Sequence, residues 1–341
     1  LHRGGPEVHD TEYANPLIVP AGNASIWSRM GIRAAYGLSL LELRKSNTRV
    51  FAMSADLGRS SGLGRFSEEF PESFLNVGIA EQLMISIAAG VARSGRAVFA
   101  STFAPFATLR AGEFLRMEIG YMESPVAVVG LGSGLSLGYL GNSHYGLEDV
   151  GVVRSMAGLA VYSPADASEM IALLNKLADK PEPCYVRLTG GPQSPHFFSS
   201  PQESGAADFT FAGTAGKKLI VSTGAVSGEV AKALKVLGLD ANQESNFGFL
   251  HVHMIKPLNQ EVINYVRAAS EVIVFDEHLA FGGLSSALLD GSAGEADHLP
   301  PIRSVNLGTS FPEQHSHDRG LDLAGLSSEA ISKVLVGFLG K

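Results

Sequence analysis

The sequence is poor in cysteine, with Cys184 as the single thiol among 341 residues. One cysteine cannot form a disulfide within the chain, and a zinc site built on several cysteines is excluded. The lack of a disulfide framework is typical of proteins in a reducing compartment, so we expect a cytoplasmic protein. No base stands beside Cys184 in the sequence, and we expect a small buried hydrophobic residue there.

Long apolar runs and an excess of positive charge are also lacking. The longest apolar run lies around residues 85–92, far below the ~18 residues of a membrane-spanning helix. Residues 1–16 are polar and contain no apolar core of a secretory signal. With 26 Lys and Arg against 34 Asp and Glu, the net charge is −8. We therefore expect neither a membrane partner nor a nucleic-acid partner, since both need a basic patch.

The chain does have a large apolar content, with 45% hydrophobic and 18% charged residues. This composition excludes a disordered tail or a coiled coil and indicates a buried core, and the length suits about two domains. We predict an extension over residues 1–24, a first domain over 25–195, a linker over 196–214 where prolines, serines and glycines cluster, and a second domain over 215–341.

Apolar runs of strand length alternate with segments of helical periodicity in both expected domains. In the first domain, strands are predicted at 49–54, 73–77, 97–101, 125–131, 159–162 and 184–188. Helices are predicted at 27–43, 80–93 and 108–122. A further helix is expected after the glycine-rich loop that ends near residue 146, and another is expected to begin at a cap in 163–166. In the second, strands are predicted at 217–222, 247–253, 271–276 and 302–307, with helices between them and a closing helix at 327–338. Such alternation predicts an α/β fold with two doubly wound, mostly parallel sheets, the second smaller.

Two segments carry side chains suited to chemistry at one edge of the first sheet. Residues 74–82 run from a strand through Gly78 into a helix with Glu81 in its first turn. Phe103 and Phe106 directly follow another strand. Ligands bind at the carboxyl ends of parallel strands, so these side chains suit a binding crevice. The alternatives are an acid that only faces a helix dipole and two rings that belong to the core.

The amino-acid sequences of these two segments resemble those of a known protein family. Gly-Ile-Ala-Glu-Gln at 78–82, followed by Ser-Thr-Phe-Ala-x-Phe at 101–106, resembles the pyrimidine-binding domain of transketolases. Residues 254–258 and 277–284 resemble the carboxyl-terminal domain of that family. Gly-Asp-Gly, part of the motif with which the family's amino-terminal domain binds diphosphate and Mg²⁺, is absent. The chain therefore resembles the carboxyl-terminal half of a split transketolase.

The resemblance implies a thiamine diphosphate enzyme with its active site between polypeptides. An N-terminal subunit would hold the diphosphate and Mg²⁺, and this chain would hold the aminopyrimidine ring without a metal ligand of its own. Two copies of each chain would form an α2β2 heterotetramer. The implied reaction transfers a two-carbon ketol unit from a ketose, expected to be phosphorylated, to an aldehyde.

Positions that match the family's motifs take on the roles the family gives them. Glu81 would hydrogen-bond N1′ of the ring and favour the tautomer that accepts the thiazolium proton. Phe106 matches the residue that packs on the ring face, and Phe103 matches its neighbour. Asp56 matches an acid near the cofactor, with a loop-capping aspartate as the alternative. His144 stands where the family has His or Gln and is expected to contact cofactor or substrate.

Three further positions match the residues with which the family binds the phosphate of a sugar substrate, namely Arg33, Ser60 and Arg187. Arginine suits this task because it presents charged, forked donors to an anion. The alternatives are a solvated helix arginine at position 33 and a salt bridge at the end of the sheet at position 187.

The sugar-contact loop departs from the family pattern. Leu140 stands where the family has an aspartate that contacts sugar hydroxyls, and Gly132 stands in place of a histidine. Sites built to hydrogen-bond a hydroxyl discriminate strongly for it. We therefore expect a donor or acceptor other than the ordinary pentose phosphate pair.

Two other functions remain open at this point. One is the β subunit of a 2-oxo-acid dehydrogenase, which shares the architecture and a glutamate in a similar place. The other is a non-catalytic partner half, which the altered sugar loop favours and the retained Glu81 and Phe106 oppose. The pairs His251/His253 and His315/His317 have no nearby acid cluster in the sequence, so we expect packing or surface positions there rather than metal ligands.

Overall fold

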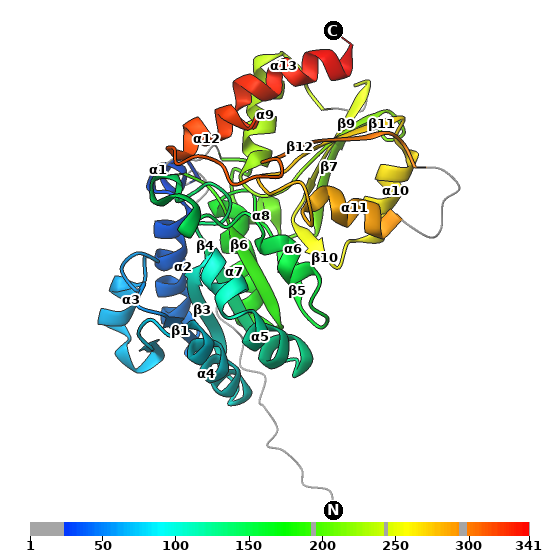
Figure 1. The fold of residues 1–341 in the computed structure, drawn as a ribbon. Coiled ribbons are helices and arrows are strands. Elements are labelled where there is room, and N and C mark those ends of the chain that lie inside the picture. The colour runs from blue at the N-terminus through cyan, green and yellow to red at the C-terminus, as the bar shows by residue number, and fades with distance from the viewer. Residues whose placement is uncertain (1–23, 192–195, 242–244, 293–298, 341) are drawn as a thin grey trace, which may run out of the picture.

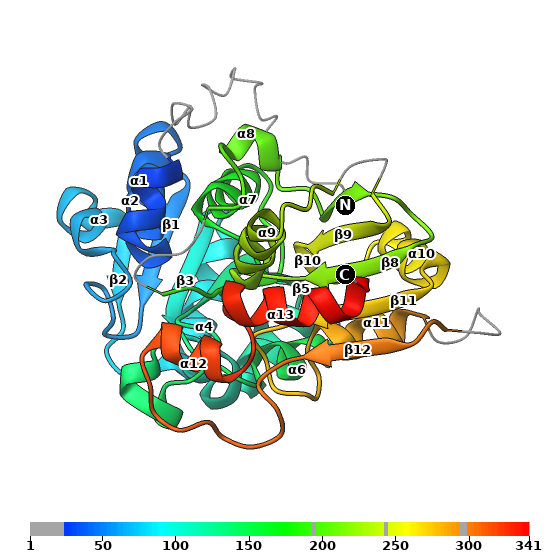
Figure 2. The ribbon, with the colours of Figure 1, turned by 90° about the horizontal axis from the view of Figure 1, so that it is seen from above.

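Two β-sheets lie next to each other in the computed structural model, which describes residues 24–191, 196–241, 245–292 and 299–340 (Figure 1). All but one residue of the expected extension lies outside the described residues. In the view turned by 90°, β1–β3 lie on one side and β8, β9, β11 and β12 on the other (Figure 2). The predicted α/β architecture with two mostly parallel sheets is confirmed.

Within the described residues, the first sheet has seven strands, all parallel to their neighbours except β10. Their order is β10 (Met254–Lys256), β5 (Ala160–Tyr162), β6 (Cys184–Leu188), β4 (Val126–Leu131), β3 (Ala97–Phe103), β1 (Val50–Ser54) and β2 (Phe74–Asn76). The antiparallel edge strand β10 comes from the second half of the chain and pairs with β5. The two halves are therefore joined by backbone hydrogen bonds as well as by packing.

The second sheet has five strands in the part of the chain that the structure describes, and β7 is its antiparallel edge. Their order is β12 (Ile302–Val305), β11 (Glu271–Phe275), β8 (Lys218–Ser222), β9 (Phe247–Val252) and β7 (Phe209–Gly213). Both β7 and the short helix α8 (Pro201–Ser204) lie within residues 196–214, where we expect a linker. The second sheet therefore begins before residue 215.

Helices cover both faces of the first sheet, so its strands are buried on both sides and need no polar alternation. In β3, Ala97 and Phe99 pack on one face and Val98 and Ala100 on the other. The first face is covered by α2 (Ile32–Ser46) and α7 (Ala167–Asp179). The second is covered by α4 (Glu81–Arg93), α6 (Asp149–Arg154) and the segment of η2 (Phe106–Arg110), α5 (Gly112–Phe114) and η3 (Leu115–Tyr121).

The second sheet is sandwiched in the same way. On one face lie α9 (Val226–Val236) and α13 (Ser328–Leu339), and on the other α10 (Gln260–Ala268) and α11 (Leu284–Ser292). The remaining helical segments of the described residues are α1 (Ala24–Met30), α3 (Gly64–Glu69), η1 (Pro71–Ser73), η4 (Gly138–Ser143) and α12 (His317–Leu323). Among the described residues, no helix is long and apolar enough to cross a membrane.

Two predicted helix boundaries differ from the structure for local reasons. The helix expected at 27–43 is broken into α1 (Ala24–Met30) and α2 by Gly31, whose φ of 78° suits a residue without a Cβ. The cap of α7 is Asp166 rather than Ser163, because the Asp166 carboxylate accepts the Glu169 N–H. The helix therefore begins at Ala167, and Pro164 lies in the loop that precedes it.

Candidate active site

The predicted cofactor residues follow three neighbouring strands of the first sheet. Asp56 follows β1, Glu81 follows β2 and Phe106 follows β3. Because β1 pairs in parallel with both β2 and β3, their carboxyl ends meet at one edge. This edge is where α/β folds bind ligands.

Glu81 is the first residue of α4 and is almost fully buried, with 2% of its side chain exposed. Its carboxylate does not face packed hydrocarbon. Both of its oxygens accept hydrogen bonds from Nη1 of Arg110, at 3.3 and 3.2 Å. The positive end of the α4 dipole also favours an anion at this position. The fold thus holds a paired carboxylate at the sheet edge.

Three rings that the sequence predicts at the cofactor pack against one another. The ring centroids of Phe103 and Phe106 are 6.1 Å apart. His144 meets both rings nearly edge-on, at 5.8 Å from Phe103 and 5.4 Å from Phe106. The Nδ1 atom of His144 lies 2.8 Å from the hydroxyl of Ser143, which orients the imidazole. The glycine-rich loop therefore brings His144 to the aromatic pair.

Arg110 links the carboxylate to the aromatic cluster. Its Cζ atom lies 4.5 Å from the ring centroid of Phe106, while Nη1 reaches Glu81. A flat group with N–H donors is thus held between an aromatic face and a buried carboxylate. The aminopyrimidine ring of thiamine diphosphate is also flat and also carries N–H donors, so these residues fit that ring. No motif points to Arg110, although its position four residues after Phe106 places it one turn along the same helical segment.

Asp56 lies in a strained turn at the same edge. Its φ is 60°, a left-handed conformation that is uncommon for a residue with a side chain. The Asp56 N–H donates to Oδ1 of Asn76 at 2.9 Å, and the same oxygen accepts the Gly78 N–H at 3.1 Å. Asn76, which the sequence does not single out, therefore fixes the Asp56 loop against the turn that leads to Glu81.

Arg33 and Ser60 share a hollow of about 430 Å³ with Arg59 and His317. Nη1 of Arg33 donates to the Ser60 carbonyl at 3.3 Å, which joins the two predicted positions. Arg59, absent from the sequence prediction, adds a second guanidinium to the lining. The lining also contains Asp318, whose side chain is 92% exposed. Two guanidinium groups outweigh this one carboxylate, so the hollow can offer positive charge to an anionic ligand.

Arg187 lies elsewhere and is enclosed by protein. Its side chain is 1% exposed, and Nε donates to the two carboxylate oxygens of Asp149 at 3.1 and 3.0 Å. Its Nη2 donates to the Glu277 carbonyl at 2.7 Å. This is the salt bridge named above as the alternative for position 187. Arg187 is not among the residues that line the hollow with Arg33 and Ser60.

The two departures in the sugar loop have different surroundings. Gly132 has a φ of 66°, and a Cβ atom there would lie 2.6 Å from Cδ1 of Leu137. A histidine therefore does not fit at position 132 with this packing. Leu140 lies in η4 and is exposed, so an apolar side chain faces solvent there.

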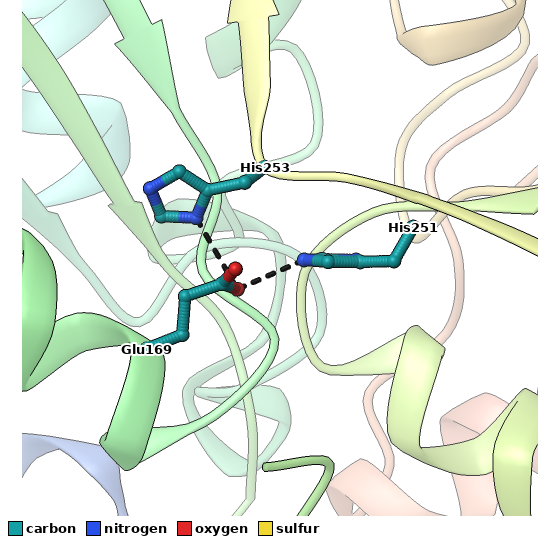
Figure 3. Close-up of side chains that lie close together, drawn as sticks. All are labelled: Glu169, His251 and His253. Atoms are coloured by element: carbon teal, nitrogen blue, oxygen red, sulfur yellow. Dashed lines mark hydrogen bonds and ion pairs between the residues drawn. The ribbon is translucent and has the colours of Figure 1, made fainter. Parts of the chain in front are cut away.

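A second cluster of ionisable groups, buried between the two sheets, contains Glu169, His251 and His253 (Figure 3). Oε2 of Glu169 lies 2.8 Å from Nε2 of His251 and 3.2 Å from Nδ1 of His253. The same oxygen accepts the Ala165 N–H at 2.7 Å, and Nδ1 of His251 is 2.7 Å from the Ser227 hydroxyl. His251 is hydrogen-bonded to Glu169, whereas neither ring nitrogen of His253 has a hydrogen-bond partner among the described residues and His253 lies only within ion-pair distance of the carboxylate. The cluster acts as a polar link between α7 and the end of β9.

The acid in this cluster corrects the sequence-based view of the two histidines. They do have a carboxylate beside them, but it belongs to Glu169 in α7, 82 residues before His251 in the sequence. All three side chains are at most 1% exposed, which agrees with the predicted packing role rather than a surface position. Three potential ligand atoms lie within 4.8 Å of one another, and the two hydrogen bonds from Ala165 and His251 both end on Oε2 of Glu169.

Replacement of Glu169 by Gln is expected to destabilise the fold in a pH-dependent way. Burial alone raises the pKa of Glu169, but His251 and His253 together hold it below its ordinary value. The carboxylate therefore stabilises the fold fully above about pH 4.3, and this contribution is lost as the pH falls towards the folded pKa. At pH 7 we expect Glu169→Gln to lower the free energy of unfolding by about 3 kcal/mol.

Urea denaturation between pH 7 and pH 3.5 measures this effect. Glu329→Gln, on the exposed face of α13, is the control and should change little at any pH. The difference between wild type and Glu169→Gln should shrink below about pH 4. A difference that stays constant down to pH 3.5, or no difference at pH 7, would contradict the assigned role.

Known proteins resemble this chain over most of its length. The family described as transketolase, pyrimidine binding domain, matches residues 28–191. A transketolase C-terminal section of Methanocaldococcus jannaschii is 31% identical over 310 residues, or 89% of this chain and 94% of that protein. One of the subunits of an apulose-4-phosphate transketolase from Phocaeicola vulgatus is 30% identical over 91% of this chain and 97% of that protein.

A solved structure shows the same arrangement of sheets. It is described as a split gene transketolase, inactive beta4 tetramer, and aligns with a TM-score of 0.73 at 29% identity, covering 91% of this chain and 99% of that chain. The resemblance inferred from the motifs is thereby confirmed. The chain belongs to the transketolase family and corresponds to the carboxyl-terminal half of a split transketolase.

Proposed function

We propose that this chain supplies the aminopyrimidine side of a thiamine diphosphate site for ketol transfer. The observation that carries the proposal is the buried carboxylate of Glu81 beside the face of Phe106. When bound, the cofactor supplies the nucleophilic carbon that takes up the two-carbon unit. Glu81 holds a proton at N1′ of the ring, and Phe106 orients the ring by packing on its face.

The neighbouring side chains keep water away and set the geometry. Phe103 is buried and supports Phe106 from the sheet side. His144 packs edge-on against both rings, and we propose that it contacts cofactor or substrate. Asp56 occupies the adjacent turn, where its carboxylate is available to a polar group of the cofactor.

The substrate is proposed to be a ketose with a terminal anionic group. Arg33, Arg59 and Ser60 line a hollow that suits such a group. The relative from Phocaeicola vulgatus is named for a phosphorylated ketose, which supports the same class. Leu140 and Gly132 stand where the family has two polar residues that contact the sugar. We therefore propose that the donor and acceptor substrates differ from the ordinary pentose phosphate pair.

The remaining half of the cofactor site is proposed to come from an N-terminal subunit that binds the diphosphate and Mg²⁺. Apolar side chains next to Glu81 and Arg110 are exposed in the single chain, namely Ile79, Leu83 and Leu109. Clustered apolar exposure of this kind is typical of a surface that another protein covers. We propose an α2β2 assembly, and the solved relative described as an inactive tetramer of β chains supports the need for a second type of subunit.

Reconstitution with the N-terminal subunit tests the proposed function. The chain alone is expected to show no ketol transfer, and the mixed subunits should cleave a phosphorylated ketose and transfer two carbons to an aldehyde. Decarboxylation of a 2-oxo acid in place of ketose cleavage would instead identify a 2-oxo-acid dehydrogenase subunit. An assembled complex that binds no thiamine diphosphate would identify a non-catalytic half.

A further inference from the structure

One side chain, Arg110, makes both contacts that the proposed function assigns to the aminopyrimidine ring. Its Nη1 lies 3.3 and 3.2 Å from the two oxygens of Glu81, and its Cζ lies 4.5 Å from the Phe106 centroid. We propose that Arg110 is a displaceable placeholder, which occupies the ring position in the cofactor-free chain and leaves when the ring binds. This inference rests on the proposed function of Glu81 and Phe106.

The guanidinium group and the ring are chemically alike in what they offer these two residues. A guanidinium is planar, delocalised and positive, and it both stacks on aromatic faces and donates forked N–H bonds to carboxylates. An aminopyrimidine that holds a proton at N1′ is likewise a flat cation with N–H donors. Glu81 and Phe106 cannot accept both groups in the same place, so one must exclude the other.

The contact with Arg110 also explains how the buried carboxylate of Glu81 is stabilised when no cofactor is bound. The Glu81 side chain is 2% exposed, and a buried carboxylate left without a partner is costly. The ion pair with Arg110 offsets the free-energy cost of burying this carboxylate. The Arg110 side chain itself is 44% exposed. It therefore has an open path into solvent when a ring arrives to replace its hydrogen bonds.

The position of Arg110 couples this exchange to assembly. Arg110 is the last residue of η2, directly after the exposed Leu109. A subunit that covers Leu109 would also change the space available to Arg110. A site that is already filled by an internal group binds its ligand more weakly, because the ligand must first displace that group. Arg110 would thus disfavour cofactor binding before the second subunit is in place.

Removal of the guanidinium should therefore strengthen cofactor binding to the full chain. We expect Arg110→Ala to bind thiamine diphosphate about five- to tenfold more tightly than wild type, since an ion pair and a cation–π contact no longer compete. Arg110→Lys keeps the charge but loses the flat stacking group, so an intermediate gain is expected. Circular dichroism verifies that each variant is folded.

The matched control is Arg116→Ala. Arg116 lies six residues further along the same segment, and its Nε and Nη2 donate to the two carboxylate oxygens of the exposed Glu113. Arg116→Ala therefore removes the same chemical group at a position that does not contact Glu81. Glu81→Gln and Phe106→Ala test the underlying site, and both should weaken binding. Ligand-observed NMR with up to about 10 mM thiamine diphosphate and Mg²⁺ detects affinities in the millimolar range that a single chain is expected to show.

The outcomes separate the placeholder from the proposed function. Tighter binding by Arg110→Ala, with Arg116→Ala unchanged, supports the inference. Equal binding by wild type and Arg110→Ala, with weaker binding by Glu81→Gln and Phe106→Ala, overturns the placeholder and leaves the proposed site standing. No effect of Glu81→Gln or Phe106→Ala overturns the site and the placeholder together. Absence of binding to both wild type and Arg110→Ala also counts against the placeholder, because removal of the guanidinium would then not free a binding position for the cofactor.

Discussion

Glu81→Gln is expected to lower the turnover of the reconstituted enzyme about 10²- to 10⁴-fold, the usual contribution of a positioned proton-transfer group. Gln matches Glu in size and still pairs with a neighbouring donor, but it carries no charge with which to hold a proton at N1′. The loss should appear in kcat for ketol transfer, measured with saturating donor and acceptor. Folding and assembly with the N-terminal subunit should be unchanged.

Glu113→Gln serves as the matched control for this substitution. Glu113 is an exposed glutamate in the neighbouring helical segment, and its partner is Arg116 rather than a residue of the site. This control should retain wild-type turnover. Full turnover in Glu81→Gln would contradict the assigned role, and so would an equal loss in Glu113→Gln.

Arg187→Met is expected to lower the free energy of unfolding by about 3–5 kcal/mol, because it leaves a buried carboxylate without its cation. Asp149 is 1% exposed and accepts two hydrogen bonds from Arg187. The Tyr185 hydroxyl remains as a donor to Asp149 at 2.9 Å but brings no charge. Denaturation in urea at pH 7 measures the loss.

Two further variants decide why Arg187 matters. The double variant Asp149→Leu and Arg187→Met removes both charges, so it should be less destabilised than Arg187→Met alone. Arg116→Met, in an exposed ion pair, should change stability by less than about 1 kcal/mol. If Arg187 instead gripped a substrate phosphate, Arg187→Met would keep its stability and lose only affinity for phosphorylated donors.

Much of the fold could be predicted because the strands of both sheets are short apolar runs between helices. The strand β4 illustrates this, since it is buried along its whole length and reads Val-Ala-Val-Val-Gly-Leu, a continuous apolar run that is visible in the sequence. The short edge strand β10 and the edge strand β7 could not be predicted in the same way. Their pairing depends on contacts with β5 and β9 that no local pattern records.

The site shows the same division between local and distant signals. Glu81, Phe103 and Phe106 lie in two short motifs whose spacing already marks them. Arg110 carries no motif, and its contact with Glu81 depends on the helical turn of η2. His251 finds its acid, Glu169, across the boundary between the two sheets, a pairing that sequence spacing does not reveal.

A crystal structure of the reconstituted enzyme with thiamine diphosphate tests most directly whether this chain holds the aminopyrimidine ring. The account predicts that a Glu81 carboxylate oxygen lies about 2.7–2.9 Å from N1′, the usual length of a charge-assisted hydrogen bond. It also predicts that Phe106 packs on the ring face and that Arg110 has left it. A ring bound elsewhere, with Glu81 still paired to Arg110, would contradict the account.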